Sequence, residues 1–156
     1  MRYTIFSTVI SVLYLIGSVI ANEAQWWQPT IENRLEVPIY IDNFDLFWGK
    51  CYDIQDSSSE VQCPSMVKIG AGEGYTFGTS GRAGTATGTE GAFDLVLEGG
   101  EKIATINFDC PGGGGSNQVN TNGPVNPGYT VAIVGFNEGQ GSFGALGSGF
   151  IEVSGE

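Results

Sequence analysis

Short hydrophobic runs separated by glycine-rich segments recur along most of the chain. Hydrophobic side chains occupy odd positions over residues 37–41 and even positions over residues 44–48. Alternate residues of a strand face opposite sides of a sheet, so this change of parity predicts one strand with a bulge at Asp42 and Asn43.

Similar β-branched and aromatic runs predict further strands over residues 66–69, 75–77, 93–97, 103–108, 129–136 and 150–153. The glycine-rich segments between them are expected to be turns and loops, at residues 78–82, 98–101, 112–116 and 139–149. No long segment has hydrophobic residues at helical spacing, and each of the 25 glycines would disfavour a helix interior by about 1 kcal/mol. The pattern predicts an all-β fold, a single-domain β-sandwich of two antiparallel sheets.

Residues 1–21 have the features of a secretory signal. Arg2 precedes an apolar run over residues 9–16, and the small residue Ala21 precedes Asn22. We therefore expect a cleaved signal peptide at residues 1–21, a mature domain at residues 22–156 and a secreted, extracellular protein. A retained membrane anchor is the weaker alternative, because the segment is barely long enough to span a bilayer and carries Ser7, Thr8 and Ser11.

Composition removes several classes of function. The 156 residues include no histidine, which excludes a Ser-His-Asp triad, a Cys-His pair and a histidine-ligated zinc site. The formal charge of -11 argues against binding to nucleic acid or simple adsorption to anionic lipid. We expect no cofactor, no metal and no enzymatic activity. A carboxylate hydrolase using Glu98 with Glu101, or Asp42 with Asp45, is disfavoured because both pairs flank turn-like sequence.

The three cysteines leave one without a partner. Cys51 and Cys63 bracket residues 52–62, an acidic, serine-rich segment expected to be a loop, and a disulfide between them is sterically plausible. Cys110 is then the spare, in an apolar setting that favours a buried thiol, although a bond from Cys110 to either of the others stays open. Three carboxylates in the loop allow a calcium site as an alternative to a solvated acidic loop, but the EF-hand spacing is absent.

Tryptophan placement is the most distinctive feature of the composition. Trp26 and Trp27 face opposite sides if they lie in a strand, so at most one of them is deeply buried by that strand. Trp48 ends an apolar run, and the sequence is compatible both with a buried core position and with an exposed contact position for this side chain.

Five short motifs follow one another in the chain. They are Ala24-Gln25-Trp26; Phe47-Trp48-Gly49-Lys50; Gly81-Arg82 followed by residues 87–96; Phe108-Asp109-Cys110-Pro111; and Gly144-Ala145-Leu146-Gly147. Their order and spacing, over residues 24–153, resemble the successive signatures of the aegerolysins. The resemblance implies a small acidic secreted β-sandwich that recognises membrane lipids, typically sphingolipids or sterol-rich assemblies. In several members such a protein forms cytolytic or hemolytic pores with a larger partner that bears a membrane-attack-complex/perforin (MACPF) domain.

The resemblance also implies a set of lipid-binding residues. They are Trp26, Trp48, Lys50, Arg82, Thr87 and Phe108. Phe108 stands where members commonly have tryptophan, Gly112 where an aromatic residue is common, and Thr87 where binders of sphingomyelin with cholesterol have an acidic residue. These departures favour a different headgroup preference or loss of binding. A secreted structural or developmental β-sandwich without lytic activity is therefore the alternative function.

Overall fold

The computed structural model describes residues 25–83, 85, 87–139 and 144–156, so the predicted signal peptide lies outside the described residues. The strands are β1 (Trp26–Asn33), β2 (Ile39–Trp48), β3 (Lys50–Asp53), β4 (Asp56–Val61), β5 (Val67–Ile69), β6 (Gly74–Thr76), β7 (Gly78–Ser80), β8 (Thr89–Leu97), β9 (Lys102–Cys110), β10 (Gln118–Thr121), β11 (Tyr129–Val134) and β12 (Gly147–Gly155).

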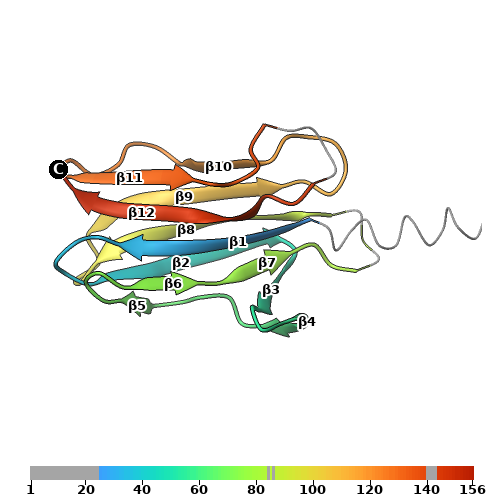
Figure 1. Ribbon diagram of the computed structural model, residues 1–156, viewed down its shortest axis with the longest axis horizontal. Coiled ribbons are helices and arrows are strands. Elements are labelled where there is room, and N and C mark those ends of the chain that lie inside the picture. Colours follow the sequence, from blue (N-terminus) through green and yellow to red (C-terminus); the bar gives the residue numbers. More distant parts are fainter. Residues whose placement is uncertain (1–24, 84, 86, 140–143) are drawn as a thin grey trace, which may run out of the picture.

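Two sheets pack face to face (Figure 1). A five-stranded antiparallel sheet has the order β10-β9-β8-β2-β5, and a seven-stranded sheet has the order β11-β12-β1-β7-β3-β4 with β6 paired to β1. The predicted β-sandwich is confirmed, but the seven-stranded sheet is mixed because β1 and β12 run parallel. These two strands come from opposite ends of the chain, and strand direction is dictated by a turn only where a hairpin joins two strands.

The predicted bulge in β2 is present. The pairing of β2 with β8 shifts between Asp42 and Asp45, and Asn43 has a φ of 48°. The extra residue changes which positions face inward, so Ile41 before it and Phe44 after it both pack in the core.

Aromatic rings fill the space between the sheets toward the end where β1 begins. Trp27 has no exposed surface, and its ring stacks on Phe108 with 4.2 Å between centroids. Phe93 and Phe77 pack against the same indole. Stacked and edge-to-face rings of this kind add about 0.5–1.5 kcal/mol per pair to the free energy gained by burial.

Two segments expected to be turns or loops are strands. Gly78–Ser80 forms the buried strand β7, and residues 52–62 fold into the β3–β4 hairpin. A Cβ on Gly78 would lie 2.3 Å from the ring of Tyr52, so this glycine makes room for a neighbouring ring. The sequence patterns also missed β1 and β10.

The cysteines behave as expected. A disulfide joins Cys51 to Cys63 and closes the base of the β3–β4 hairpin, while Cys110 is free and buried.

Candidate functional site

Two hollows lie at one end of the sandwich, on either side of Gly49. Here the chain passes from β2 in the five-stranded sheet to β3 in the seven-stranded sheet, and Gly49 has a φ of 101°. A Cβ at this position would lie 2.5 Å from the Ser80 carbonyl oxygen and 3.0 Å from Thr89 Oγ1. Both the φ and the crowding require glycine, and the crossing leaves Trp48 and Lys50 in different hollows.

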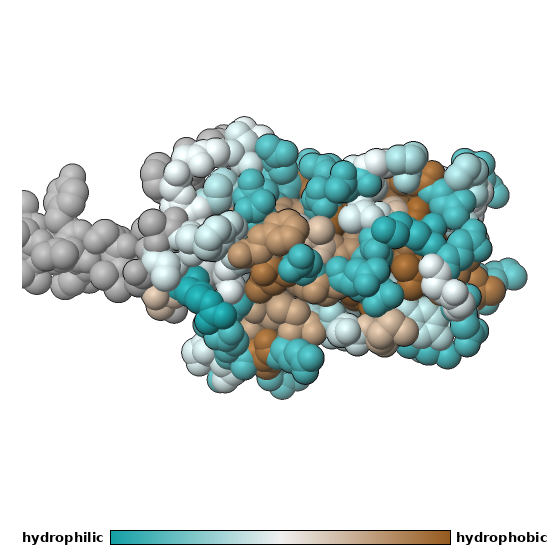
Figure 2. Space-filling view, turned by 180° about the vertical axis from the view of Figure 1, so that it is seen from behind, coloured by the Kyte–Doolittle hydropathy of each residue, from teal (hydrophilic) through white to brown (hydrophobic). Residues whose placement is uncertain are grey.

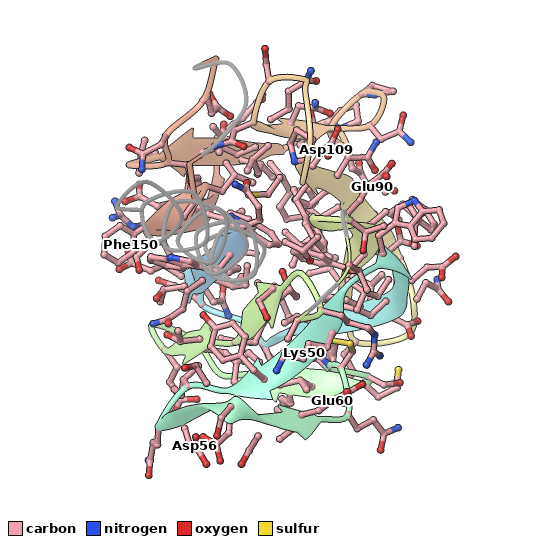
Figure 3. The ribbon with its side chains drawn as sticks, turned by 90° about the vertical axis from the view of Figure 1, so that its right-hand side faces the viewer. Lys50, Asp56, Glu60, Glu90, Asp109 and Phe150 are labelled. Atoms are coloured by element: carbon pink, nitrogen blue, oxygen red, sulfur yellow. A yellow bond between two sulfur atoms is a disulfide. The ribbon has the colours of Figure 1, made fainter. Side chains whose placement is uncertain are left out.

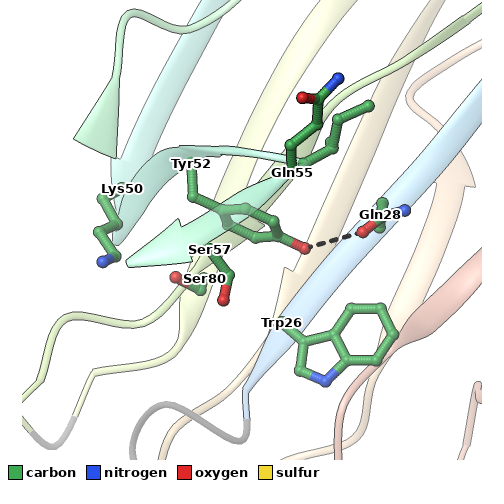
Figure 4. Close-up of a pocket in the computed structure, with 8 residues that line it drawn as sticks. Trp26, Gln28, Lys50, Tyr52, Gln55, Ser57 and Ser80 are labelled. Atoms are coloured by element: carbon green, nitrogen blue, oxygen red, sulfur yellow. Dashed lines mark hydrogen bonds between the residues drawn. The ribbon is translucent and has the colours of Figure 1, made fainter. Parts of the chain in front are cut away.

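The first hollow, which we call the Lys50 hollow, has a volume of about 390 Å³. It is lined by strand residues Trp26, Gln28, Lys50, Tyr52 and Ser80 and by hairpin residues Ile54, Gln55 and Ser57 (Figure 4).

The ring of Tyr52 separates Lys50 from Trp26 in the close-up view of this hollow (Figure 4). The ring crosses Gly78, and its hydroxyl donates a hydrogen bond to Gln28 Oε1 at 3.2 Å. Burial raises the pKa of Tyr52, so the hydroxyl stays protonated at neutral pH.

The carboxylates near Lys50 are occupied by other partners. Arg82 donates two hydrogen bonds of 2.7 Å to Glu60, which lower the pKa of that carboxyl. Asp56 accepts hydrogen bonds from Ser58 and Ser59, and these lower its pKa. The β3–β4 hairpin thus retains its negative charge without an ion pair to Lys50 among the described residues.

The second hollow, which we call the Trp48 hollow, has a volume of about 260 Å³ and is lined by Trp48, residues 87–90 and residues 109–114. Trp48 is 57% exposed and the adjacent Phe47 is 52% exposed. Viewed over the five-stranded sheet, hydrophobic side chains gather toward this end of the molecule among hydrophilic ones (Figure 2).

Carboxylates supply the charge of the Trp48 hollow. Glu90 and Asp109 are directly opposite one another in β8 and β9, away from Lys50 and Glu60 in the view onto this end (Figure 3). Burial raises the pKa of Asp109, and it raises the pKa of the Cys110 thiol to about 11. A thiol with that pKa is almost fully protonated at neutral pH and is a poor nucleophile.

The two hollows therefore offer aromatic faces, hydroxyls and charges suited to binding. Over the described ranges, no group of three or more His, Cys, Asp or Glu side chains could hold a metal ion. Within the same part of the chain there is also no helix of the length and hydrophobicity needed to cross a membrane.

The family model described as Aegerolysin matches residues 24–155. The chain belongs to the aegerolysin family. It is 31% identical to Asp-hemolysin of Aspergillus fumigatus over 126 residues, 79% of this chain and 89% of that protein. It is also 31% identical to Aegerolysin Aa-Pri1 of Cyclocybe aegerita, over 79% of this chain and 87% of that one. The solved structure of IP-1A from Alcaligenes faecalis is 29% identical, with a TM-score of 0.76, and the match covers 89% and 96% of the two chains.

In this aegerolysin, the residues predicted to bind lipid divide into separate groups. Trp26 and Lys50 line one hollow, whereas Trp48 and Thr87 line the other. Arg82 is bound to Glu60 of the hairpin, so its charge is compensated locally.

Phe108 requires a correction. It is 1% exposed and stacks on Trp27, so its ring cannot contact a lipid at the surface. The side chain of Phe108 alternates with that of Asp109, and it is Asp109 that reaches the Trp48 hollow. Phe108 therefore belongs to the core of this aegerolysin, below the surface that carries the two hollows.

The sequence patterns missed most of the polar lining of the Lys50 hollow. Gln28, Ser57 and Ser80 lie in β1, β4 and β7, and none of these segments was predicted to be a strand. Only Gln28 left a signal, since it shares a strand face with Trp26 two residues earlier.

Proposed function

We propose that this aegerolysin binds membranes rich in sphingolipid or sterol through the end of the sandwich that carries Trp26 and Trp48. The observation that carries the proposal is the 57% exposure of Trp48 beside the exposed ring of Phe47. Indole rings favour the interface between water and lipid because they combine an apolar body with a polar N–H.

Aromatic insertion and headgroup contacts supply the affinity in this proposal. With a formal charge of -11, the protein gains nothing from general attraction to anionic lipid. One interfacial tryptophan contributes about 1–3 kcal/mol, which corresponds to weak attachment, so several contacts must act together. We assign these contacts to Trp26, Trp48, Lys50 and Thr87, with Arg82 holding the hairpin.

We further propose that the protein is secreted after removal of residues 1–21 and acts in cytolysis or hemolysis with a larger MACPF pore-forming partner. The family membership and the name of the relative Asp-hemolysin support this role. Protein recovered from culture medium should begin near Asn22, and an intact Met1 on membrane-bound protein would contradict the processing. On dye-loaded vesicles the protein alone should bind without release, whereas release without any partner would contradict the need for one.

Vesicle cosedimentation tests the binding itself. Trp26→Ala and Trp48→Ala should each weaken binding to sphingomyelin–cholesterol vesicles by about tenfold or more, or about 1.4 kcal/mol. Phe150→Ala is the matched control, because Phe150 is 44% exposed but lines neither hollow. Thermal melts should confirm that all three variants remain folded.

Salt provides an independent criterion. Binding should change little between low and physiological ionic strength, because screening weakens attraction between charges and not aromatic insertion. Binding that requires anionic lipid, disappears in moderate salt and ignores both tryptophans would contradict the proposal. Folded protein that binds no vesicle would instead favour the secreted structural role.

A further inference from the structure

Three side chains form a row across neighbouring strands of the seven-stranded sheet. Lys50 in β3 is directly opposite Ser80 in β7, and Ser80 is directly opposite Trp26 in β1. Side chains at opposed positions project from the same face with Cβ atoms about 5 Å apart. All three line the Lys50 hollow, so the backbone pairing itself fixes an ammonium, a hydroxyl and an indole in that order (Figure 4).

The ammonium of Lys50 is available to a ligand. Asp56 and Glu60 lie near enough for its charge to lower the pKa of each, but neither forms an ion pair with it. Glu60 is held by Arg82, and Asp56 is held by hydrogen bonds within the hairpin. In contrast, the basic side chains of Arg34 and Lys102 are paired with carboxylates.

Hydroxyl groups near Lys50 also lack protein partners. Ser57 is exposed and Ser80 is 7% exposed, and among the described residues the hydroxyls of both hydrogen-bond to no other protein group. Hydroxyls that are not committed to protein partners are free to donate to a ligand oxygen. The acceptor oxygen of Gln28 is turned to Tyr52, so it does not compete for these donors.

We propose that the Lys50 hollow is a subsite for a tetrahedral oxyanion, a phosphate group that accepts hydrogen bonds from Lys50, Ser57 and Ser80. Trp26, at the far end of the row, supplies an aromatic face for the alkyl or ammonium part of a phosphate ester. The Trp48 hollow does not suit an anion, because its charged groups are Glu90 and Asp109. A lipid headgroup and a soluble phosphate ester present the same group, and only the membrane source rests on the proposed function.

Titration with inorganic phosphate and with phosphocholine, followed by NMR at constant ionic strength, tests the subsite. Chloride and acetate serve as reference anions. Lys50→Gln should weaken phosphate binding by about tenfold or more. Lys68→Gln is the matched control, because it removes one positive charge from an exposed residue of β5 in the other sheet, and it should change the affinity by less than about twofold.

The inference is overturned if phosphate binds no better than acetate, or if both lysine variants weaken binding equally. Ser57→Ala removes a donor from the exposed hairpin and should weaken phosphate binding several-fold, which provides a second test if Lys50→Gln lowers the melting temperature. An unchanged phosphate affinity in a folded Ser57→Ala variant counts against the hydroxyl contribution and overturns the site as drawn.

Vesicles separate the two sources of phosphate. Sphingomyelin vesicles should bind more tightly than vesicles in which ceramide, which lacks the phosphate, replaces sphingomyelin at equal sterol content. If soluble phosphate binds through Lys50 but no vesicle binds, the subsite stands and the membrane proposal fails. If vesicles bind and Lys50→Gln behaves as Lys68→Gln in every assay, the subsite fails and the membrane proposal stands.

Discussion

The two hollows share one end of the sandwich but are lined by different strands and by side chains of opposite charge. The Lys50 hollow lies on the paired strands β1, β7 and β3 and is walled by a disulfide-closed hairpin. The Trp48 hollow lies where β8 and β9 begin and end, with glycines 112–114 along one side. One has a lysine without an ion pair and the other has two carboxylates. A single crossing at Gly49 therefore separates a hollow that holds an ammonium from one that holds two carboxylates and an exposed indole.

Because of this contrast, Trp48 and Lys50 are expected to contact different parts of a ligand. Trp48 and Lys50 are two positions apart, yet only Trp48 is prominent on the surface, at 57% exposure. We propose phosphate recognition for the Lys50 hollow, whereas Trp48 is the exposed aromatic residue of the other hollow, so substitutions can test the two separately.

The largest expected effect comes from the core that lies beneath both hollows. Phe108→Ala should lower the free energy of unfolding by about 3–5 kcal/mol, because it removes a buried ring stacked on Trp27. Both hollows should lose ligand binding together. Urea denaturation measures the loss, with the exposed Phe150→Ala as a control that should stay within about 0.5 kcal/mol of the unchanged protein. A Phe108→Ala variant of unchanged stability would contradict the core position.

The disulfide should affect one hollow only. In the chain-entropy model, replacing Cys51 and Cys63 by serine lowers stability by about 3 kcal/mol, as expected for a loop of this size. The hairpin carrying Ser57 should loosen, so phosphate binding should fall more than the contacts of the Trp48 hollow. Thermal melts and phosphate titration measure the two effects. Equal disturbance of both hollows would mean that they are not separable.

Two glycines allow the hollows to be perturbed in turn. An added Cβ would lie 2.3 Å from the Tyr52 ring at Gly78, and 1.7 Å from the carbonyl oxygen of Cys110 at Gly88. Each alanine variant should cost about 1–3 kcal/mol through overpacking. NMR shift changes should concentrate around Tyr52 in Gly78→Ala and around Trp48 in Gly88→Ala. Shift changes spread over both hollows in both variants would contradict the structural separation of the two hollows.

The smallest effect is the contribution of Asp109, in the Trp48 hollow, to the pH dependence of stability. Burial raises the pKa of Asp109, so the folded state binds a proton more tightly than the unfolded state does. Stability from this group is greatest below its unfolded pKa and declines as the pH rises through the folded pKa. Asp109→Asn should therefore raise the melting temperature at neutral pH, and this gain should shrink as the pH falls toward the unfolded pKa, where Asp109 is protonated in both states. A lower melting temperature at neutral pH would contradict the sign.

Local patterns were sufficient for the outline of the fold. The parity change in β2 predicted the bulge, because side-chain alternation depends only on the strand itself. The adjacent tryptophans divided between core and surface for the same reason, with Trp27 buried and Trp26 partly exposed. The spacing of Cys51 and Cys63 similarly made their disulfide a reasonable expectation.

The binding site was decided by contacts between distant strands. Phe108 matched a motif associated with lipid contact, but its place opposite Trp27 across the core could not be known before the sheets were packed. Gly78–Ser80 has the composition of a turn but forms a strand, in which it pairs with the distant strands β1 and β3. The row of Lys50, Ser80 and Trp26 joins three segments far apart in sequence, since register between non-adjacent strands is set by tertiary packing and leaves no local signal.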